Sequence, residues 1–234
     1  MNKAVEVKKL YSCTLPYLKP LFDSCVYPWE ILLKIEDYIK EIVETGIEGF
    51  ERMSDKVLVG KDVKFYPTAT IEGYAIIGSG TVIRPGAFLR GNVITGRNCV
   101  IGNSSEMKNC ILLDKVQIPH YNYVGDSILG NFSHLGAGTI CSNLKNDGKS
   151  VVIHAERDFD TRMRKVGAFL GDGANVGCSC VLNPGTVIGK DTSVYPMNSL
   201  RGVYPEDVIV KDKGEIVIKK PEGFFNEDKK CSKP

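Results

Sequence analysis

A group of polar side chains between positions 90 and 149 has the residue types needed to bind an anion and to move a proton. Its members are Arg90, Glu106, Lys108, His120, Tyr123, Asn143 and Lys149. Two neighbouring cations such as Arg90 and Lys108 repel each other unless an anion lies between them, and phosphate is the natural candidate. The alternative is that both cations are solvated charges on a protein surface.

His120 follows Pro119 and is the candidate for proton transfer. An imidazole removes protons near neutral pH, and a carboxylate partner fixes its tautomer. Glu106 is the candidate partner. The alternative is a surface histidine or one that is hydrogen-bonded for structural reasons.

A six-residue repeat must position these side chains. From Ile71 onward a mostly aliphatic residue returns at every sixth position, and glycine often follows it directly. The repeat positions are Ile71, Ile77, Ile83, Leu89, Thr95, Ile101 and Met107, and later Leu170, Val176, Leu182, Ile188, Val194 and Leu200. A period of six fits neither a helix nor a heptad, but it contains three strand alternations. It predicts a mainly β protein built as a left-handed parallel β-helix.

The repeat also predicts which side chains share a face. If three six-residue sides complete one coil, residues 18 positions apart stack, as Arg90 and Lys108 do. Glu106 lies about one coil before His120. Arg84 lies 24 positions before Lys108, which is one side more than a coil, so we expect Arg84 to lie on another face.

Three segments resemble the acetyltransferase half of the bacterial bifunctional N-acetylglucosamine-1-phosphate uridyltransferase/glucosamine-1-phosphate N-acetyltransferase. They are GNSSEMK (102–108), HYNYVGD (120–126) and LGAGTI (135–140), the last followed by Asn143. The match runs without a gap from Leu89 to Lys149. These motifs are more specific than the hexapeptide repeat, which many acyltransferases share.

The resemblance implies a role for each matching residue. It implies that His120 is the general base, with Glu106 hydrogen-bonded to the imidazole. It further implies that Arg90, Lys108, Tyr123 and Lys149 hold the phosphate of an amino-sugar phosphate, and that Asn143 contacts the sugar near its amine. Ala137 and Gly138 match the segment that contacts the acetyl group of acetyl-CoA. Amide formation of this kind needs a base and N–H donors for the oxyanion, and no metal.

The resemblance also implies a homotrimer with sites between subunits and a small-molecule substrate. Residues 1–56 are too short for a nucleotide-binding domain, so we expect no nucleotidyltransferase domain here. The chain departs from the family at Leu144, Asp172 and Ser133, where the family has a tyrosine, a serine near the thioester and a sugar-contacting asparagine. These changes motivate an alternative, a non-catalytic module that binds a sugar phosphate or nucleotide sugar or that supports assembly.

A third possibility is a metal-dependent hydratase like the γ-class carbonic anhydrases, which share this scaffold. Such an enzyme needs three histidines at one metal. This chain has only His120, His134 and His154, without a close pair.

The pattern divides the chain into three parts. Residues 1–56 lack the repeat, and a helix beginning at Pro28 and ending at Gly46 is expected to cap one end of the β-helix. Residues 57–205 form the β-helix, with a projecting loop at 142–168. Residues 206–234 form a hairpin followed by a flexible tail.

Composition narrows the classes of protein to which this chain could belong. The chain has 234 residues and a formal net charge of +2, which gives no reason to expect a nucleic-acid partner. No apolar stretch is long enough to cross a bilayer and no secretory signal is evident, so we expect a cytoplasmic protein without membrane contact. The eight cysteines include no CxxC pair, which favours reduced structural thiols.

Overall fold

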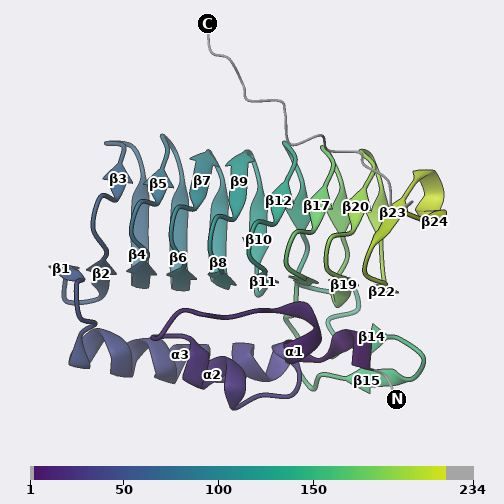
Figure 1. Ribbon diagram of the computed structural model, residues 1–234, viewed down its shortest axis with the longest axis horizontal. Coiled ribbons are helices and arrows are strands. Elements are labelled where there is room, and N and C mark those ends of the chain that lie inside the picture. The colour runs from purple at the N-terminus through teal and green to yellow at the C-terminus, as the bar shows by residue number, and fades with distance from the viewer. Residues whose placement is uncertain (1–2, 220–234) are drawn as a thin grey trace, which may run out of the picture.

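The computed structural model describes residues 3–219 and contains a parallel β-helix with helices along one flank (Figure 1). Strands stack in parallel register from coil to coil and form three sides. Side 1 is one ladder of β3 (Lys64–Phe65), β5 (Val82–Ile83), β7 (Val100–Asn103), β9 (Gln117–His120), β12 (His134–Leu135), β17 (Asn175–Val176), β20 (Ser193–Val194) and β23 (Val208–Val210). The predicted mainly β, parallel β-helical fold is confirmed.

Sides 2 and 3 are joined in the early coils, because β4 (Thr70–Ile77), β6 (Phe88–Thr95) and β8 (Glu106–Leu112) run across both. Side 2 continues through β10 (Tyr123–Gly125), β13 (Ile140–Cys141), β18 (Val181–Leu182) and β21 (Ser199–Leu200). Side 3 begins at β2 (Val57–Val59) and continues through β11 (Ile128–Leu129), β16 (Ala168–Leu170), β19 (Thr186–Ile188) and β22 (Val203–Tyr204).

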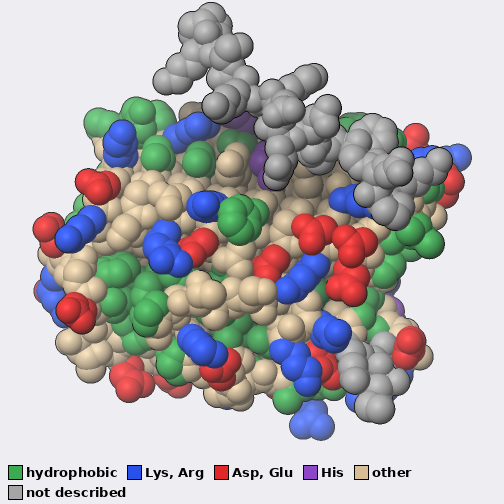
Figure 2. Space-filling model, viewed as in Figure 1, with side chains coloured by type: hydrophobic (Ala, Val, Ile, Leu, Met, Phe, Trp, Pro, Cys, Tyr) green, Lys and Arg blue, Asp and Glu red, His purple; other side chains and the backbone are tan. Residues whose placement is uncertain are grey.

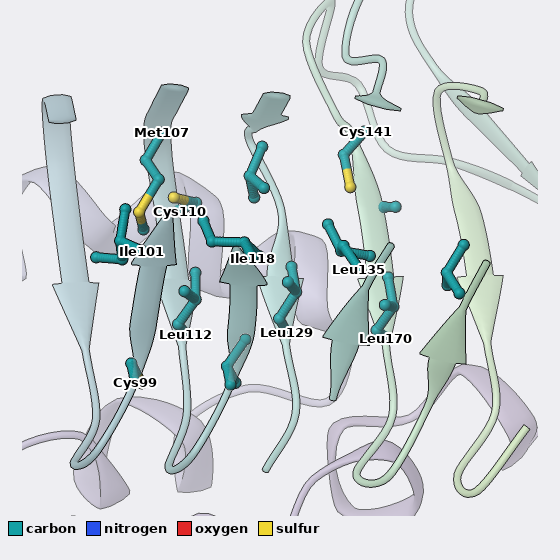
Figure 3. Close-up of a cluster of buried hydrophobic side chains, with 14 of the residues drawn as sticks. Cys99, Ile101, Met107, Cys110, Leu112, Ile118, Leu129, Leu135, Cys141 and Leu170 are labelled. Atoms are coloured by element: carbon teal, nitrogen blue, oxygen red, sulfur yellow. The ribbon is translucent and has the colours of Figure 1, made fainter. Parts of the chain in front are cut away.

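The aliphatic residues of the repeat point into the coil and form its core (Figure 3). Ile101, Met107, Leu135 and Leu170 are all fully buried. Cysteines occupy core positions as well: Cys99, Cys110, Cys141 and Cys180 are buried. Burial raises the pKa of the Cys99 and Cys141 thiols to about 12, so they act as small apolar side chains.

The N-terminal segment covers side 3 and does not cap an end, so this prediction was wrong. It contains η1 (Lys3–Val5), α1 (Val7–Leu10), α2 (Lys19–Asp23) and α3 (Pro28–Thr45). Figure 1 shows α3 running along the flank, where it packs on β4, β6 and β8. The helix itself begins and ends as expected, at Pro28 and before Gly46, whose φ of 83° stops it.

A row of outward-facing apolar side chains explains this placement. Ile76, Ile94, Ile111, Ile128, Phe169 and Val187 follow one another in register on side 3, and all are fully buried. They form a second hydrophobic core with the helices. Each one immediately precedes an inward-facing residue, so side 3 is apolar on both faces and has to be covered.

The 142–168 insertion folds back onto the helical segment instead of projecting. It forms the hairpin of β14 (Val152–His154) and β15 (Asp158–Asp160). The Phe159 ring lies 5.7 Å from the Trp29 ring and 5.2 Å from the Tyr27 ring, between centroids. Trp29 is also 6.2 Å from Phe169 on side 3. Insertion, helix and β-helix therefore share one core.

The boundaries differ slightly from those predicted. β1 (Glu51–Ser54) already pairs with β2, and β23 pairs in parallel with β20, so strand pairing with the coils begins at residue 51 and the parallel ladders reach residue 210. β23 and β24 (Ile216–Ile218) form the expected antiparallel hairpin around η2 (Asp212–Gly214). The predicted flexible tail lies, from residue 220, outside the described residues. Within residues 3–219 no helix is long and apolar enough to span a bilayer.

Candidate active site

The predicted site residues lie around the corner between sides 1 and 2. His120 ends β9 on side 1, and Tyr123 begins β10 on side 2. Tyr121 and Asn122 form the turn between them, with Tyr121 at a φ of 51°. The Asn122 side chain is buried and donates a hydrogen bond to the carbonyl of Gly136, 2.8 Å away, which fixes the turn against the next coil.

Arg90 and Lys108 are direct neighbours on side 2, as their 18-residue spacing predicted. Arg84 follows β5 on side 1, so the choice of Arg90 over Arg84 as the neighbour of Lys108 is confirmed. Tyr123 aligns with Glu106 in the adjacent coil. The repeat therefore brings Arg90, Glu106, Lys108 and Tyr123 together on one outward face.

Each cation of this face has its own carboxylate, which the sequence did not indicate. Arg90 Nε donates to Glu106 Oε1 at 2.6 Å, and this bond holds the pKa of Arg90 above its usual value. Lys108 Nζ donates to both carboxylate oxygens of Asp126 at 3.0 Å. An anion between the two cations is therefore not needed to relieve their repulsion. On the face that Figure 2 shows, cationic and acidic side chains are likewise interspersed.

The expected hydrogen bond between Glu106 and His120 is replaced by this Arg90–Glu106 ion pair. Glu106 is nevertheless close to the corner, because its N–H donates to the Asn122 carbonyl at 2.8 Å. Among residues 3–219 no hydrogen bond to the His120 imidazole is present, and the side chain is exposed. The imidazole is therefore accessible to a substrate.

Asn143 joins the group from the start of the insertion. Its amide Nδ2 donates to the Tyr123 hydroxyl at 3.2 Å and also to Asp126. Burial raises the pKa of Tyr123, and the nearby Glu106 carboxylate raises it further. Tyr123 therefore stays a neutral hydrogen-bonding group at physiological pH.

Lys149 is not part of this cluster. Its side chain is exposed, its N–H bonds to Asp147, and within the described part of the chain its ammonium makes no contact with Arg90 or Lys108. The turn at 145–149 is closed by a hydrogen bond from the Gly148 N–H to the Lys145 carbonyl at 3.0 Å, and Lys149 follows it outside the cluster.

The main chain beside His120 contains a possible oxyanion donor. Gly138 N–H donates to the His120 carbonyl at 3.0 Å, so it is already used. The Ala137 N–H has no acceptor among the described residues, and the residue is half-buried. Of the two residues predicted to contact the acetyl group, Ala137 thus keeps an N–H without an acceptor among the described residues, whereas the Gly138 N–H ties this turn to His120.

Two of the three departures from the family, Asp172 and Ser133, have structural explanations here. Asp172 lies at the corner between sides 3 and 1, where it accepts from Ser12 N–H at 2.8 Å and pairs with Lys190 at 3.2 Å. It anchors the N-terminal segment and does not face His120. Ser133 is buried and donates to the Gly130 carbonyl, as a small corner residue. Leu144 is exposed at 43%.

The histidines do not converge. His134 contacts Asn175 on side 1, and His154 lies in the hairpin, bonded to Asp158 and Arg201. Within residues 3–219 no group of three histidine, cysteine or acidic side chains could hold a metal ion.

Comparison with known proteins agrees with the motifs. A family model described as the GMPPB C-terminal domain matches residues 71–161. The protein named bifunctional protein GlmU of Methanococcus maripaludis is 33% identical over 240 residues, covering 94% of this chain and 54% of the relative. The M. vannielii protein of the same name is 32% identical, covering 94% and 53%. This chain is similar to the GlmU proteins over nearly its whole length.

The resemblance inferred from the three motifs is therefore confirmed. The chain spans about half the length of the curated relatives that it matches. Because the match to these GlmU proteins covers 94% of the chain, it extends beyond the β-helix. Among solved structures, a hexapeptide transferase family protein from Anaplasma phagocytophilum has a TM-score of 0.44 at 13% identity, covering 72% of this chain and 87% of that one.

Proposed function

We propose that this chain is an N-acetyltransferase that moves the acetyl group of acetyl-CoA to the amine of an amino-sugar phosphate resembling glucosamine-1-phosphate. One observation carries the proposal. An exposed histidine, His120, shares a corner with the unused N–H of Ala137 and with a side that bears two cations. A protein named bifunctional sugar-1-phosphate nucleotidylyltransferase/acetyltransferase, from Sulfurisphaera tokodaii, is 33% identical over 152 residues, covering 64% of this chain and 38% of that relative.

The proposed reaction forms one C–N bond and breaks one C–S bond. The neutral amine attacks the thioester carbon while His120 takes up the proton that the nitrogen loses. Negative charge develops on the thioester oxygen, where the Ala137 N–H is available as a donor. The intermediate collapses, the thiolate of CoA leaves, and it accepts a proton from the imidazolium.

Arg90 and Lys108 are proposed to bind the phosphate of the sugar. The Arg90–Glu106 pair is about one-third exposed on both sides, so a phosphate can compete for Arg90 in water. Glu106 is then free to accept a hydrogen bond from His120, in the role that the resemblance assigns to it. Tyr123 and Asn143 are proposed to contact the sugar.

The resemblance further supports a homotrimer with sites between subunits. The helices occupy side 3 of each chain. We therefore propose that neighbouring copies approach sides 1 and 2, next to His120. Analytical ultracentrifugation measures the mass directly, and a monomer at micromolar concentration would remove this part of the proposal.

The test is acetyl transfer in vitro. Purified protein is mixed with acetyl-CoA and glucosamine-1-phosphate, and release of free CoA thiol is followed. Thiol release that requires the sugar phosphate supports the proposal. Calorimetry with each compound alone separates the alternative: binding of glucosamine-1-phosphate without binding of acetyl-CoA at millimolar concentration indicates a non-catalytic sugar-phosphate module.

A further inference from the structure

Asp126 is a buried carboxylate that connects the candidate substrate-binding residues to one another. Its side chain is only 4% exposed. It accepts two hydrogen bonds from Lys108 Nζ at 3.0 Å, one from Asn109 Nδ2 at 3.0 Å and one from Asn143 Nδ2. Two residues to which the resemblance gives a role in substrate binding are therefore held by one carboxylate.

The position of Asp126 follows from a shortened side. The register between β6 and β8 shifts by one residue after Arg90, so a single residue turns the corner between sides 2 and 3 in the coils of β8 and β10. Asn109 and Asp126 occupy this corner with φ of 51° and 44°. Such left-handed conformations are tolerated best by glycine, asparagine and aspartate.

The ends of the insertion close over Asp126. Gly167 N–H donates to the Asp126 carbonyl at 2.7 Å, and Val166 N–H donates to the Asn143 carbonyl at 3.0 Å. A Cβ on Gly167 would come within 2.0 Å of the Gly125 carbonyl oxygen, so only glycine permits this approach. The insertion thus takes Asp126 out of water and brings Asn143 to it.

The two carboxylates of the cluster differ in their freedom to move. Glu106 is 34% exposed, and among the described residues its carboxylate is hydrogen-bonded to Arg90 alone. Asp126 is desolvated and satisfied by three side chains, so an incoming phosphate cannot displace it without leaving a buried charge unpaired. We propose that Asp126 is a positioning residue: it fixes the Lys108 ammonium and the Asn143 amide, and through Lys108 it gives the site its preference for a phosphorylated amino sugar. This inference rests on the proposed function.

A simple electrostatic role predicts the opposite effect. If Asp126 were only a counter-charge, replacing it with a neutral side chain would add one positive charge beside the phosphate and tighten binding. If Asp126 positions Lys108 and Asn143, the same replacement loosens both groups and weakens binding. The sign of the change in KM therefore decides between the two.

The test compares Asp126→Asn with Asp114→Asn in the full chain. Asparagine keeps the shape and tolerates the φ of 44°. Asp114 is the matched control, because it is also mostly buried and paired with a cation, Arg97, but at the corner between sides 3 and 1. The probes are glucosamine-1-phosphate and glucosamine, each with acetyl-CoA, and circular dichroism checks that both variants are folded.

For Asp126→Asn we expect the KM for glucosamine-1-phosphate to rise by about tenfold or more, as expected for the loss of one charge-assisted hydrogen bond. The ratio of kcat/KM between glucosamine-1-phosphate and glucosamine falls by a similar factor, while the KM for acetyl-CoA changes by less than about twofold. Asp114→Asn leaves all three values as they are. A general structural defect would lower kcat/KM for both sugars by the same factor and leave the ratio between them unchanged.

An unchanged or lower KM for glucosamine-1-phosphate in Asp126→Asn overturns the inference while leaving the proposed function in place. If the wild-type protein binds the sugar phosphate without acetylating it, the proposed acetyltransferase activity is refuted. The two variants are then compared by their calorimetric affinity for glucosamine-1-phosphate in place of KM. If the wild type binds neither compound, both proposals fall. Should Asp126→Asn not fold, Asn109→Gly removes one donor to Asp126 at a φ that glycine accepts, and is expected to shift KM in the same direction by a smaller factor.

Discussion

The outward-facing row on side 3 predicts that Ile111 behaves as a core residue although it points away from the coil. Ile111 is fully buried between Ile94 and Ile128 in register, beneath α3. Replacing it with alanine removes three carbon groups, which accounts for about 2.4 kcal/mol at 0.8 kcal/mol each. The cavity left under the helix adds to this, so we expect Ile111→Ala to cost about 3–4 kcal/mol of unfolding free energy.

Ile209 is the matched control for this substitution. It also points outward, between the inward-facing Val208 and Val210, but on side 1, where it is only half-buried. We expect Ile209→Ala to cost less than about 1 kcal/mol.

Urea unfolding followed by far-UV circular dichroism gives both values. The fluorescence of Trp29, the only tryptophan, reports on the contact between helices and β-helix. Equal costs for the two variants, or a Trp29 transition well before loss of the β signal in the wild type, would refute the idea that helices and β-helix form one core.

Three further predictions concern pH, thiols and substrate binding. Burial raises the pKa of Tyr17 and of Cys99 above their ordinary values of 10.0 and 9.0, so the unfolded chain loses these protons at lower pH than the folded chain does. We therefore expect the free energy of unfolding to be at its full value below about pH 9 and to fall as the pH rises toward 11, which a falling urea midpoint would show. Cys178 is exposed and Cys141 is buried with a raised pKa, so a thiol reagent at pH 8 should modify Cys178 in the folded protein and Cys141 only after unfolding, as mass spectrometry of peptides can show. Arg90→Ala should raise the KM for glucosamine-1-phosphate by about 10–100-fold and leave the KM for acetyl-CoA nearly unchanged, and equal changes in both would count against a phosphate role.

The sequence predicted the β-helix well because the six-residue period depends on local alternation and on the inward-facing residues alone. The same arithmetic placed Arg90 and Lys108 side by side and excluded Arg84. Side-chain partners across coils were harder to predict. Glu106 lies within reach of both Arg90 and the corner that bears His120, and the ion pair with Arg90 is present in the structure.

The sequence did contain a signal for the covering helices, which the end-cap prediction overlooked. Pairs of adjacent apolar residues such as Ile76–Ile77, Ile111–Leu112 and Phe169–Leu170 recur on one side of each coil. The first of each pair cannot face inward if the second does, so it has to meet another element. The role of Asp126 was less accessible, because it depends on a one-residue shortening and on an insertion whose path the repeat does not describe.

The central claim is that the His120 imidazole removes the proton from a sugar amine bound against Arg90 and Lys108. The most direct measurement is the rate of CoA release by His120→Ala at saturating glucosamine-1-phosphate and acetyl-CoA, with the mass of the assembly determined in parallel. We predict a rate at least about 100-fold below that of the wild type, as expected for the loss of a general base, with an unchanged assembly. A rate equal to that of the wild type would contradict the account.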